Sequence, residues 1–307
     1  MGEAFLAPAE FVRSTEALSE SYTPAQAETY TRWLATHHYE NFHVVSFLLP
    51  KSLHQDFFNV YAYCRWADDL GDEIGDPVES LRLLEWWRGE LDAMYSGRAT
   101  HPVFVALRAT AGRHDIPKEP FADLLAAFVQ DQTVTRYRSW KDLFGYCRYS
   151  ANPVGRLVLY LCGYRDPARQ QLSDCTCTAL QLANFWQDVK VDLLKDRIYI
   201  PLEVVDRHGY STEELFAHRD TAAFRAVMRE CVARARELFI AGLPLSGTVD
   251  RRLALDIDLF SRGGMRILEK IEERDYDVLQ ARPAISKMER MWLLLRSLGR
   301  IAFRRAA

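Results

Sequence analysis

Three aspartates and a glutamate crowd into the end of an otherwise apolar and aromatic stretch. The segment YAYCRWADDLGDE, residues 61–73, places Asp68 and Asp72 four positions apart, with Asp69 beside them. On a helix, side chains at that spacing project from one face, so the two carboxylates repel each other. A solvated helix face is the ordinary explanation, but the preceding tyrosines and tryptophan are typical of a core. We therefore expect a cation to compensate these charges.

A second set of oxygen-bearing side chains occurs in QLANFWQDVKVDLLKDRIYIP, residues 181–201. Asn184, Asp188 and Asp192 recur every fourth position, and Gln181 lies nearly in line with them. Oxygen ligands without histidine or thiolate suit a hard cation such as Mg²⁺. Two such ladders, facing each other across a helical bundle, would hold Mg²⁺ ions bridged by a diphosphate. Together they predict an enzyme that acts on diphosphate compounds.

Apolar residues recur with helical spacing along nearly the whole chain, and these helices must position the two ladders. The first ladder falls on a helix predicted for residues 53–70, and the second on a long helix predicted for residues 168–194. Thr23 and Pro24 predict the start of an earlier helix, because proline is favoured in the first turn. A short helix is predicted after Pro201, and another after a capping box formed by Ser211 and Glu214. Further helices are predicted at residues 78–95, 102–112, 118–132, 220–241, 249–274 and 286–304.

One predicted helix, from Asp142 to Cys162, contains Asn152 followed by Pro153. Proline lacks a backbone donor, so we expect a kink at this point. No run of period-two alternation, no internal repeat and no low-complexity linker is found. The sequence therefore predicts an all-α fold in a single domain.

Composition and charge exclude several classes of protein. The 307 residues are 49% hydrophobic and 26% charged, as in a globular chain with ample apolar material for a core. A net charge of -3 gives no general attraction to nucleic acid, and we expect no such partner. The six cysteines lack the spacing of a zinc site and the density of a disulfide scaffold, which favours reduced thiols and a cytoplasmic location. We also expect neither an export signal nor a membrane span, which needs about 20 apolar residues.

In their order along the chain, the two ladders resemble the aspartate-rich motifs of the squalene and phytoene synthases, which join two prenyl diphosphates head to head. CRWADDLGDE is similar to the first motif and QLANFWQDVKVDLLKDRIYIP to the second. The resemblance continues in HHYENFHVVSFLLP at 37–50, LFGYCRYSANPVG at 143–155 and YDVLQARPAIS at 276–286. It implies one isoprenoid synthase domain over residues 1–307, a helical bundle with a central cavity.

Departures from the family pattern resemble one branch of it. Gln187 stands where members usually carry arginine, Val191 where an acidic residue is frequent, and Glu40 where a basic residue is common. With ENF, SANPVG, NFWQDV and GGMRILEKI, they are similar to the bacterial hydroxysqualene synthases of the HpnC type, which serve hopanoid pathways. This resemblance implies ionisation of presqualene diphosphate, with water capturing the carbocation. It also implies about two or three Mg²⁺ ions as cofactor. The sequence contains no nicotinamide-binding glycine fingerprint, so we expect no NADPH.

The resemblance and the ladders together assign roles to individual residues. Metal ligands are expected at Asp68, Asp69, Asp72, Asn184, Asp188 and Asp192. Contacts with the diphosphate or the rest of the substrate are expected from His38, Phe42, Arg65, Gln181 and Arg197. A surface ion pair is the alternative role for each arginine, and a structural hydrogen bond is the alternative for the histidine. Catalytic roles are expected at Tyr146, Asn152 and Tyr199.

Apolar and aromatic walls would shield the carbocation from bulk water, and aromatic faces stabilise positive charge directly. The candidates are Phe42, Tyr63, Tyr146, Phe185 and Trp186, with core packing as the alternative role for each. At Asn152, a polar amide beside the kink could orient the water that captures the cation. A purely structural kink is the alternative there.

The C-terminal stretch, residues 286–305, combines an apolar stripe with six basic residues. This pattern fits docking on an anionic bilayer, and it fits equally a terminal helix packed on the bundle. We expect at most a peripheral association with the inner surface of a membrane.

Two other functions stay open. The chain could be a squalene or phytoene synthase that condenses two farnesyl or geranylgeranyl diphosphates. It could also be a non-catalytic, membrane-associated helical partner protein, although two intact ladders of carboxylates argue against that alternative.

Overall fold

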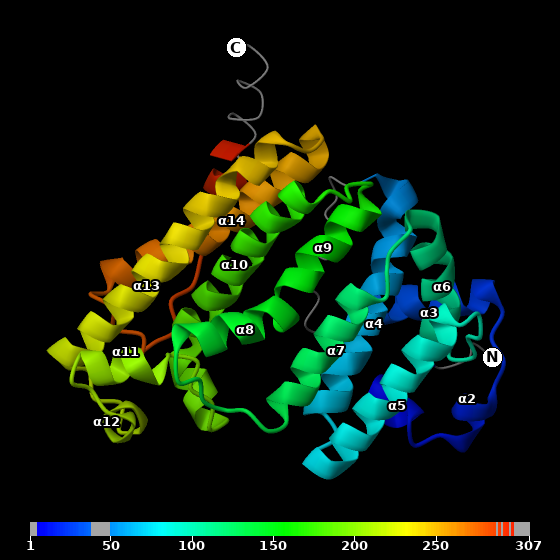
Figure 1. The fold of residues 1–307 in the computed structure, drawn as a ribbon, viewed down its shortest axis with the longest axis horizontal. Helices are drawn as coiled ribbons and strands as arrows, with labels where there is room; N and C mark the ends of the chain where they lie inside the picture. Colours follow the sequence, from blue (N-terminus) through cyan, green and yellow to red (C-terminus); the bar gives the residue numbers. More distant parts are fainter. Residues whose placement is uncertain (1–4, 38–49, 287, 290, 295, 298–307) are drawn as a thin grey trace. The chain divides into compact units, whose positions relative to one another are not determined.

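The computed structural model describes residues 5–37, 50–286, 288, 289, 291–294, 296 and 297. Within these residues the regular structure is helical, and the only strand-like pairing is an isolated bridge between Arg136 and Ile198 (Figure 1). The all-α prediction is confirmed. The chain forms two compact units: the first contains Met1–Thr133 and Arg156–Arg165, and the second contains Val134–Gly155 and Asp166–Ala307.

The first unit is built around the helix that carries the first ladder. Its elements are α1 (Pro8–Phe11), α2 (Thr15–Ser19), α3 (Pro24–His37), η1 (Lys51–Leu53), α4 (His54–Asp72), α5 (Pro77–Tyr95), α6 (Pro102–His114), α7 (Glu119–Asp131) and the later part of α9 (Asn152–Leu161). Helices α3, α5, α6 and α7 all contact α4.

Aromatic packing fixes the rotation of α4 about its own axis. Tyr63 and Trp66 are fully buried, and the ring of Trp66 stacks on Trp87 of α5 with 4.9 Å between centroids. The indole N–H of Trp66 donates to the hydroxyl of Tyr30 on α3 at 3.1 Å. Because this face of α4 is held inside, Asp68 and the residue one turn later fall on its more accessible side.

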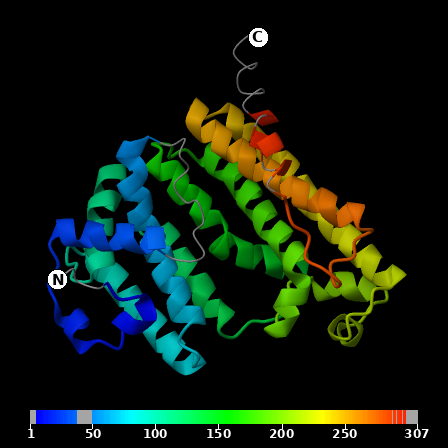
Figure 2. The ribbon, with the colours of Figure 1, turned by 180° about the vertical axis from the view of Figure 1, so that it is seen from behind.

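The second unit is arranged around the long helix that carries the second ladder. Its elements are α8 (Trp140–Ser150), the first turn of α9, α10 (Pro167–Leu194), α11 (Leu202–Arg207), α12 (Thr212–Phe216), α13 (Ala222–Gly242), η2 (Leu243–Gly247) and α14 (Arg251–Glu273). Helices α13 and α14 run alongside α10, as both views show (Figures 1 and 2). A Cβ atom at Gly264 of α14 would lie 2.2 Å from the ring of Phe239, so only glycine permits this close approach.

The structure differs from the sequence prediction between residues 142 and 162. The single kinked helix expected there is two helices, α8 and α9, separated at Ala151, whose φ and ψ are -114° and -50°. Pro153 has no backbone N–H to donate to the preceding turn, so the helix restarts instead of bending. Helices α1 and α2 were not predicted, because elements of four or five residues show no recognisable period.

Among the described residues, no helix combines the length and the apolar character that a membrane span requires. A single isoprenoid synthase domain over residues 1–307 and a central cavity stay predictions, since the two compact units are described separately.

Candidate functional site

The first ladder divides between two environments on α4. The side chain of Asp68 is 40% exposed and Asp72 is exposed, whereas the side chain of Asp69 is only 4% exposed. Asp69 lies about 100° around the helix from its neighbour and points toward the interior. The structure thus brings Asp68 and Asp72 to one accessible face, and it places Asp69 apart from them.

Arg65 lies one turn before the first ladder and is buried. Its guanidinium forms an ion pair with Asp69 and a second one with Asp68, at 3.1 Å from the Asp68 carboxylate. Burying a charge is costly unless an opposite charge accompanies it, so Arg65 and Asp69 account for each other's burial. A contact between Arg65 and a diphosphate stays a prediction.

The second ladder lies on the accessible side of α10. Asn184 is exposed, while Gln181, Asp188 and Asp192 are half-buried. Phe185, Trp186, Gln187 and Val189, which lie between the ladder residues in sequence, are buried, whereas Lys190 and Val191 are exposed. The expected alignment of oxygen-bearing side chains along one helix face is therefore present.

Burial and a neighbouring negative charge disfavour the ionised form of Asp192 on α10. Burial, and then the negative charge of Asp188, raise the pKa of Asp192 to about 7, although Arg197 and Lys195 partly offset the effect. Two carboxylates one helical turn apart cannot both ionise easily without a cation between them. Their chemistry fits a hard divalent ion, although among the described residues no three His, Cys, Asp or Glu side chains gather into a ready-made metal site.

An arginine that the sequence reasoning did not single out faces this ladder. Arg282 binds the carboxylate of Asp188 through Nε and Nη2, and the second of these contacts is 3.0 Å long. The side-chain amide of the buried Gln187 donates to the backbone carbonyl of Pro283. Arg282 belongs to the YDVLQARPAIS motif, so its presence there was the signal that could have identified it. Gln187, which stands where the family usually has arginine, helps to hold the adjoining segment in place.

Several predicted site residues line a small hollow at the C-terminal end of the second ladder. The hollow, of about 10 Å³, is bordered by Asp192, Arg197 and Tyr199, among others. The backbone N–H of Arg197 donates to the carbonyl of Asp192 at 2.9 Å, which closes the C-terminal turn of α10. Arg197 is thereby held beside the ladder, as expected from the sequence.

Four aromatic rings gather in the second unit. Tyr199 stacks on Phe185 with 3.7 Å between ring centroids and an interplanar angle of 5°. Tyr146 lies 6.1 Å from Tyr199, and Tyr137, which the sequence reasoning did not select, lies 5.8 Å from Tyr199 and 5.3 Å from Tyr146 between ring centroids. The structure therefore brings the predicted Tyr146 and Tyr199 together with Phe185.

Two other aromatic candidates lie in the interior. Tyr63 is fully buried in the first unit, and its hydroxyl donates to the carbonyl of Phe121 at 2.8 Å. Trp186 is fully buried in the second unit. Core packing accounts for both.

Asn152 begins α9 and is buried against α10. Its side-chain oxygen accepts a hydrogen bond from the hydroxyl of Thr178 at 2.9 Å. The amide NH₂ group is the remaining donor of this side chain. His38 and Phe42, together with Glu40, lie outside the described residues, so the structure says nothing of their expected roles.

The helical architecture is shared with solved isoprenoid synthases. The crystal structure titled squalene synthase HpnC from Alicyclobacillus acidocaldarius superposes with a TM-score of 0.79 and 42% sequence identity, over 83% of this chain and 96% of that chain. A dehydrosqualene synthase solved with a ligand superposes with a TM-score of 0.80 at 22% identity, over 91% of this chain and 98% of that chain, a likeness in fold. The isoprenoid synthase fold expected from the motifs is confirmed.

Sequence comparison gives the family. The family model described as squalene/phytoene synthase matches residues 35–289. A hydroxysqualene synthase from Sinorhizobium fredii is 34% identical over 87% of this chain and 90% of its own length. Another, from Rhodopseudomonas palustris, is 33% identical over 78% of this chain and 82% of its own length. A phytoene synthase from Thermus thermophilus is 33% identical over 84% of this chain and 87% of its own length. The chain belongs to the squalene/phytoene synthase family, and its resemblance to the HpnC-type branch is confirmed.

Proposed function

We propose that this protein is a Mg²⁺-dependent enzyme that converts presqualene diphosphate and water into hydroxysqualene and diphosphate. Membership of the family supports action on prenyl diphosphates, and the matches with hydroxysqualene synthases support this reaction. The observation that carries the proposal is the ladder on α10, where burial and then the negative charge of Asp188 raise the pKa of Asp192 to about 7. Such a pair is suited to a divalent ion and to the diphosphate that accompanies it.

The proposed ligands of Mg²⁺ are Asp68 and Asp72 on α4, and Asn184, Asp188 and Asp192 on α10. When bound, the ions would offset the negative charge that develops on the departing diphosphate. Asp69 was also expected to bind metal. Its buried ion pair with Arg65 favours a positioning role, in which Asp69 orients the guanidinium toward its other partner.

Arginines would bind the phosphate oxygens. Arg65, Arg197 and Arg282 all lie beside a predicted ladder carboxylate, and a guanidinium forms charge-assisted hydrogen bonds with phosphate in a planar fork. Gln181, His38 and Phe42 remain proposed contacts for the rest of the substrate. In this reaction the carbon–oxygen bond to diphosphate breaks, and the electron pair leaves with the diphosphate.

The aromatic cluster would protect the resulting carbocation until it meets the intended water. The rings of Tyr146, Phe185 and Tyr199 form a continuous apolar surface whose π faces are attracted to positive charge. Asn152 would donate from its amide NH₂ to the oxygen of that water, because its carbonyl oxygen already accepts from Thr178. The water oxygen forms the new bond to carbon and releases one proton.

Condensation of two farnesyl or geranylgeranyl diphosphates is the second candidate function. The phytoene synthase of Thermus thermophilus matches this chain at 33% identity, which is the same as one of the hydroxysqualene synthases. Both reactions need carboxylate ladders and an apolar site, so the substrate must be tested directly.

The test is incubation of the purified full chain with presqualene diphosphate or with the shorter prenyl diphosphates, with Mg²⁺ or with EDTA. Mass spectrometry of extracted products should show hydroxysqualene only in the incubation that contains both presqualene diphosphate and Mg²⁺. Asp188→Asn should lower the rate about 100-fold, as for other groups that stabilise transition-state charge. Asp92→Asn, at an exposed ion pair on α5, is the matched control and should act like wild type. Phytoene formed from geranylgeranyl diphosphate, or squalene formed from farnesyl diphosphate when NADPH is added as the reductant, with no conversion of presqualene diphosphate to hydroxysqualene, would establish the second function instead.

A further inference from the structure

Large apolar side chains are exposed together in the C-terminal segment, which is defined here by the described residues from Ser286 to Ser297. Met288 is 83% exposed, Met291 62% and Trp292 55%. Single exposed hydrophobic residues are common on protein surfaces, but three within five positions of one segment form a patch. We call these three residues the apolar patch.

Polar contacts at both ends hold this segment on α14. Glu289 accepts from the backbone N–H of Ser286 at 2.8 Å, and its carboxylate binds Arg266 of α14 at 2.8 Å. At the other end, the hydroxyl of the buried Ser297 donates to Asp258 of α14 at 2.6 Å. Because the segment is fixed at two points, the fold determines where its exposed apolar patch lies on α14.

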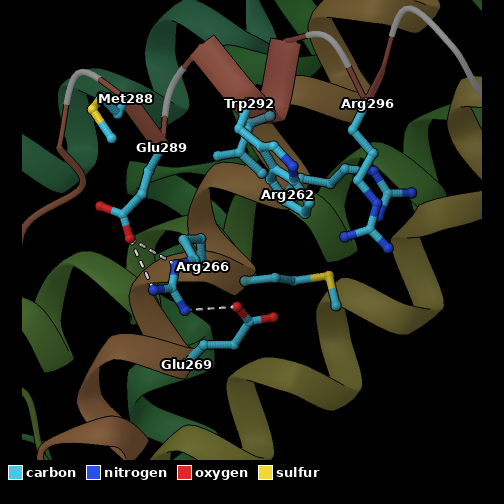
Figure 3. A pocket seen from close by; sticks show the side chains of 9 residues that line it. Arg262, Arg266, Glu269, Met288, Glu289, Trp292 and Arg296 are labelled. Atoms are coloured by element: carbon cyan, nitrogen blue, oxygen red, sulfur yellow. Dashed lines mark hydrogen bonds and ion pairs between the residues drawn. The ribbon is translucent and has the colours of Figure 1, made fainter.

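A cavity of about 420 Å³ lies between α14 and the C-terminal segment (Figure 3). Its lining includes Arg262, Met265, Arg266, Met288, Trp292 and Arg296. Trp292 and Arg296 descend from the segment above α14 in Figure 3, and the guanidinium of Arg296 stacks over the Trp292 ring at 4.8 Å. Arginine and tryptophan side by side at the edge of an apolar patch match the polar and apolar layers of a membrane interface.

Charge separates the arginines of this surface into two groups. Arg266 is surrounded by Glu269, Glu273 and Glu289, so its charge is offset within the protein, and the charge of Arg262 is offset by Asp258 at 2.8 Å. Arg296 instead contacts the face of an aromatic ring and keeps its charge near the surface. Residues 286–307 contain six basic residues and one acidic residue, in a chain whose net charge is -3. The C-terminal end is therefore basic on an acidic protein.

We infer that the C-terminal segment docks this protein on the surface of an anionic phospholipid bilayer. The apolar patch enters the region between headgroups and acyl chains, and Arg296 contacts lipid phosphates, with Arg262 lining the cavity behind it. A second copy of the chain is a poorer occupant, because a two-fold interface would bring the same basic surfaces against each other. A bilayer with anionic headgroups supplies the complementary charge. This inference does not depend on which prenyl diphosphate the protein uses.

The experiment is flotation of the full chain with vesicles of phosphatidylcholine alone or of phosphatidylcholine mixed with phosphatidylglycerol. We expect binding to the mixed vesicles only, and we expect it to weaken as salt rises. Met291→Ser combined with Trp292→Ser should weaken it by about tenfold or more, since buried apolar area drives insertion. Arg296→Gln should weaken it about fivefold, whereas Arg296→Lys should retain binding.

The matched control replaces two exposed apolar residues elsewhere, Val78→Ser with Ile240→Ser, whose side chains are 76% and 56% exposed. This variant should bind vesicles like wild type. Circular dichroism melting of every variant ensures that a loss of binding does not reflect unfolding. Equal binding to neutral vesicles, absence of binding, or wild-type binding by the Met291→Ser, Trp292→Ser variant would overturn the inference. It would also be overturned if light scattering showed a dimer that this variant dissociates.

Discussion

Arg282 and Asp188 form a two-point ion pair that joins the segment after α14 to the carboxylate ladder of α10. The guanidinium lies against the ligand that we propose for Mg²⁺, and burial, together with the charge of Asp188, raises the pKa of Asp192. The guanidinium of Arg282 therefore offsets the negative charge of the ladder without a metal. It also competes with any bound metal for the carboxylate of Asp188.

Arg282→Gln should therefore lower the melting temperature of the metal-free protein and enlarge the rise in melting temperature produced by added Mg²⁺. Removing the guanidinium leaves the carboxylates of Asp188 and Asp192 to repel each other. A bound divalent ion therefore stabilises the folded variant more than it stabilises the wild-type protein. Calorimetric titration of Mg²⁺ should show an affinity several times higher than in wild type, on the order of threefold to tenfold. Arg282→Lys keeps the positive charge, so its Mg²⁺ affinity should lie between those of wild type and Arg282→Gln. An unchanged Mg²⁺ response in Arg282→Gln would show that the ion does not engage Asp188.

Asn152→Ala should change the distribution of products if the amide orients the capturing water. We expect a shift from hydroxysqualene to other alcohols or to olefins formed by proton loss, detected by mass spectrometry. Thr178→Val is the matched control, because it removes the hydroxyl that donates to Asn152 but leaves the amide in place. It should lower stability by about 1 kcal/mol and leave the product ratio nearly unchanged. A wild-type product profile from Asn152→Ala would leave Asn152 with a structural role only.

Replacing Gly263 or Gly264 of α14 with alanine should change the free energy of unfolding in opposite directions. A Cβ at Gly264 would lie 2.2 Å from Phe239, so Gly264→Ala should destabilise the fold by about 1–3 kcal/mol through overpacking. A Cβ at Gly263 meets nothing within 4 Å, so Gly263→Ala should stabilise α14 by about 0.5–1 kcal/mol. Urea unfolding measures both. Equal effects of the two variants would contradict the close packing of α14 on α13.

His101 should make the stability of the protein fall in mild acid. Burial lowers the pKa of its imidazole to about 3, and rings of Trp66 and Trp87 lie 4.4 and 4.9 Å away. The unfolded chain takes up a proton near pH 6.5, whereas the folded chain does not until much lower pH. Stability is therefore greatest above about pH 6.5 and falls toward pH 4, by up to about 1.4 kcal/mol per pH unit.

His101→Asn is the informative variant for that pH dependence. The Nδ1 atom of His101 accepts from the backbone N–H of Val103 at the start of α6, and asparagine can also cap a helix there. Urea unfolding between pH 8 and pH 4 should give a shallower decline for the variant, even if its stability is lower throughout. Parallel curves for the two proteins would mean that His101 is protonated in the folded state.

The sequence was sufficient to identify the helices and the chemistry that they carry. Apolar spacing located α4 and α10, and intervals of four placed Asp68 with Asp72, and Asn184 with Asp188 and Asp192, on single helix faces. These relationships lie within one helix, and the geometry of a helix is the same wherever it occurs. The family resemblance was carried by the same residues, and the comparisons confirmed it.

Contacts between residues distant in sequence could not be predicted in this way. The pairing of Arg282 with Asp188, the bond from Gln187 to Pro283, and the stacking of Tyr199 on Phe185 depend on how separate segments pack within one unit. Likewise, the sequence showed a basic, apolar C-terminal stretch, but only its attachment to α14 decided that the apolar patch stays exposed at the edge of a cavity. Local spacing determines which side chains share a helix face. Tertiary packing alone determines what that face meets, because burial and charge pairing depend on neighbours from elsewhere in the chain.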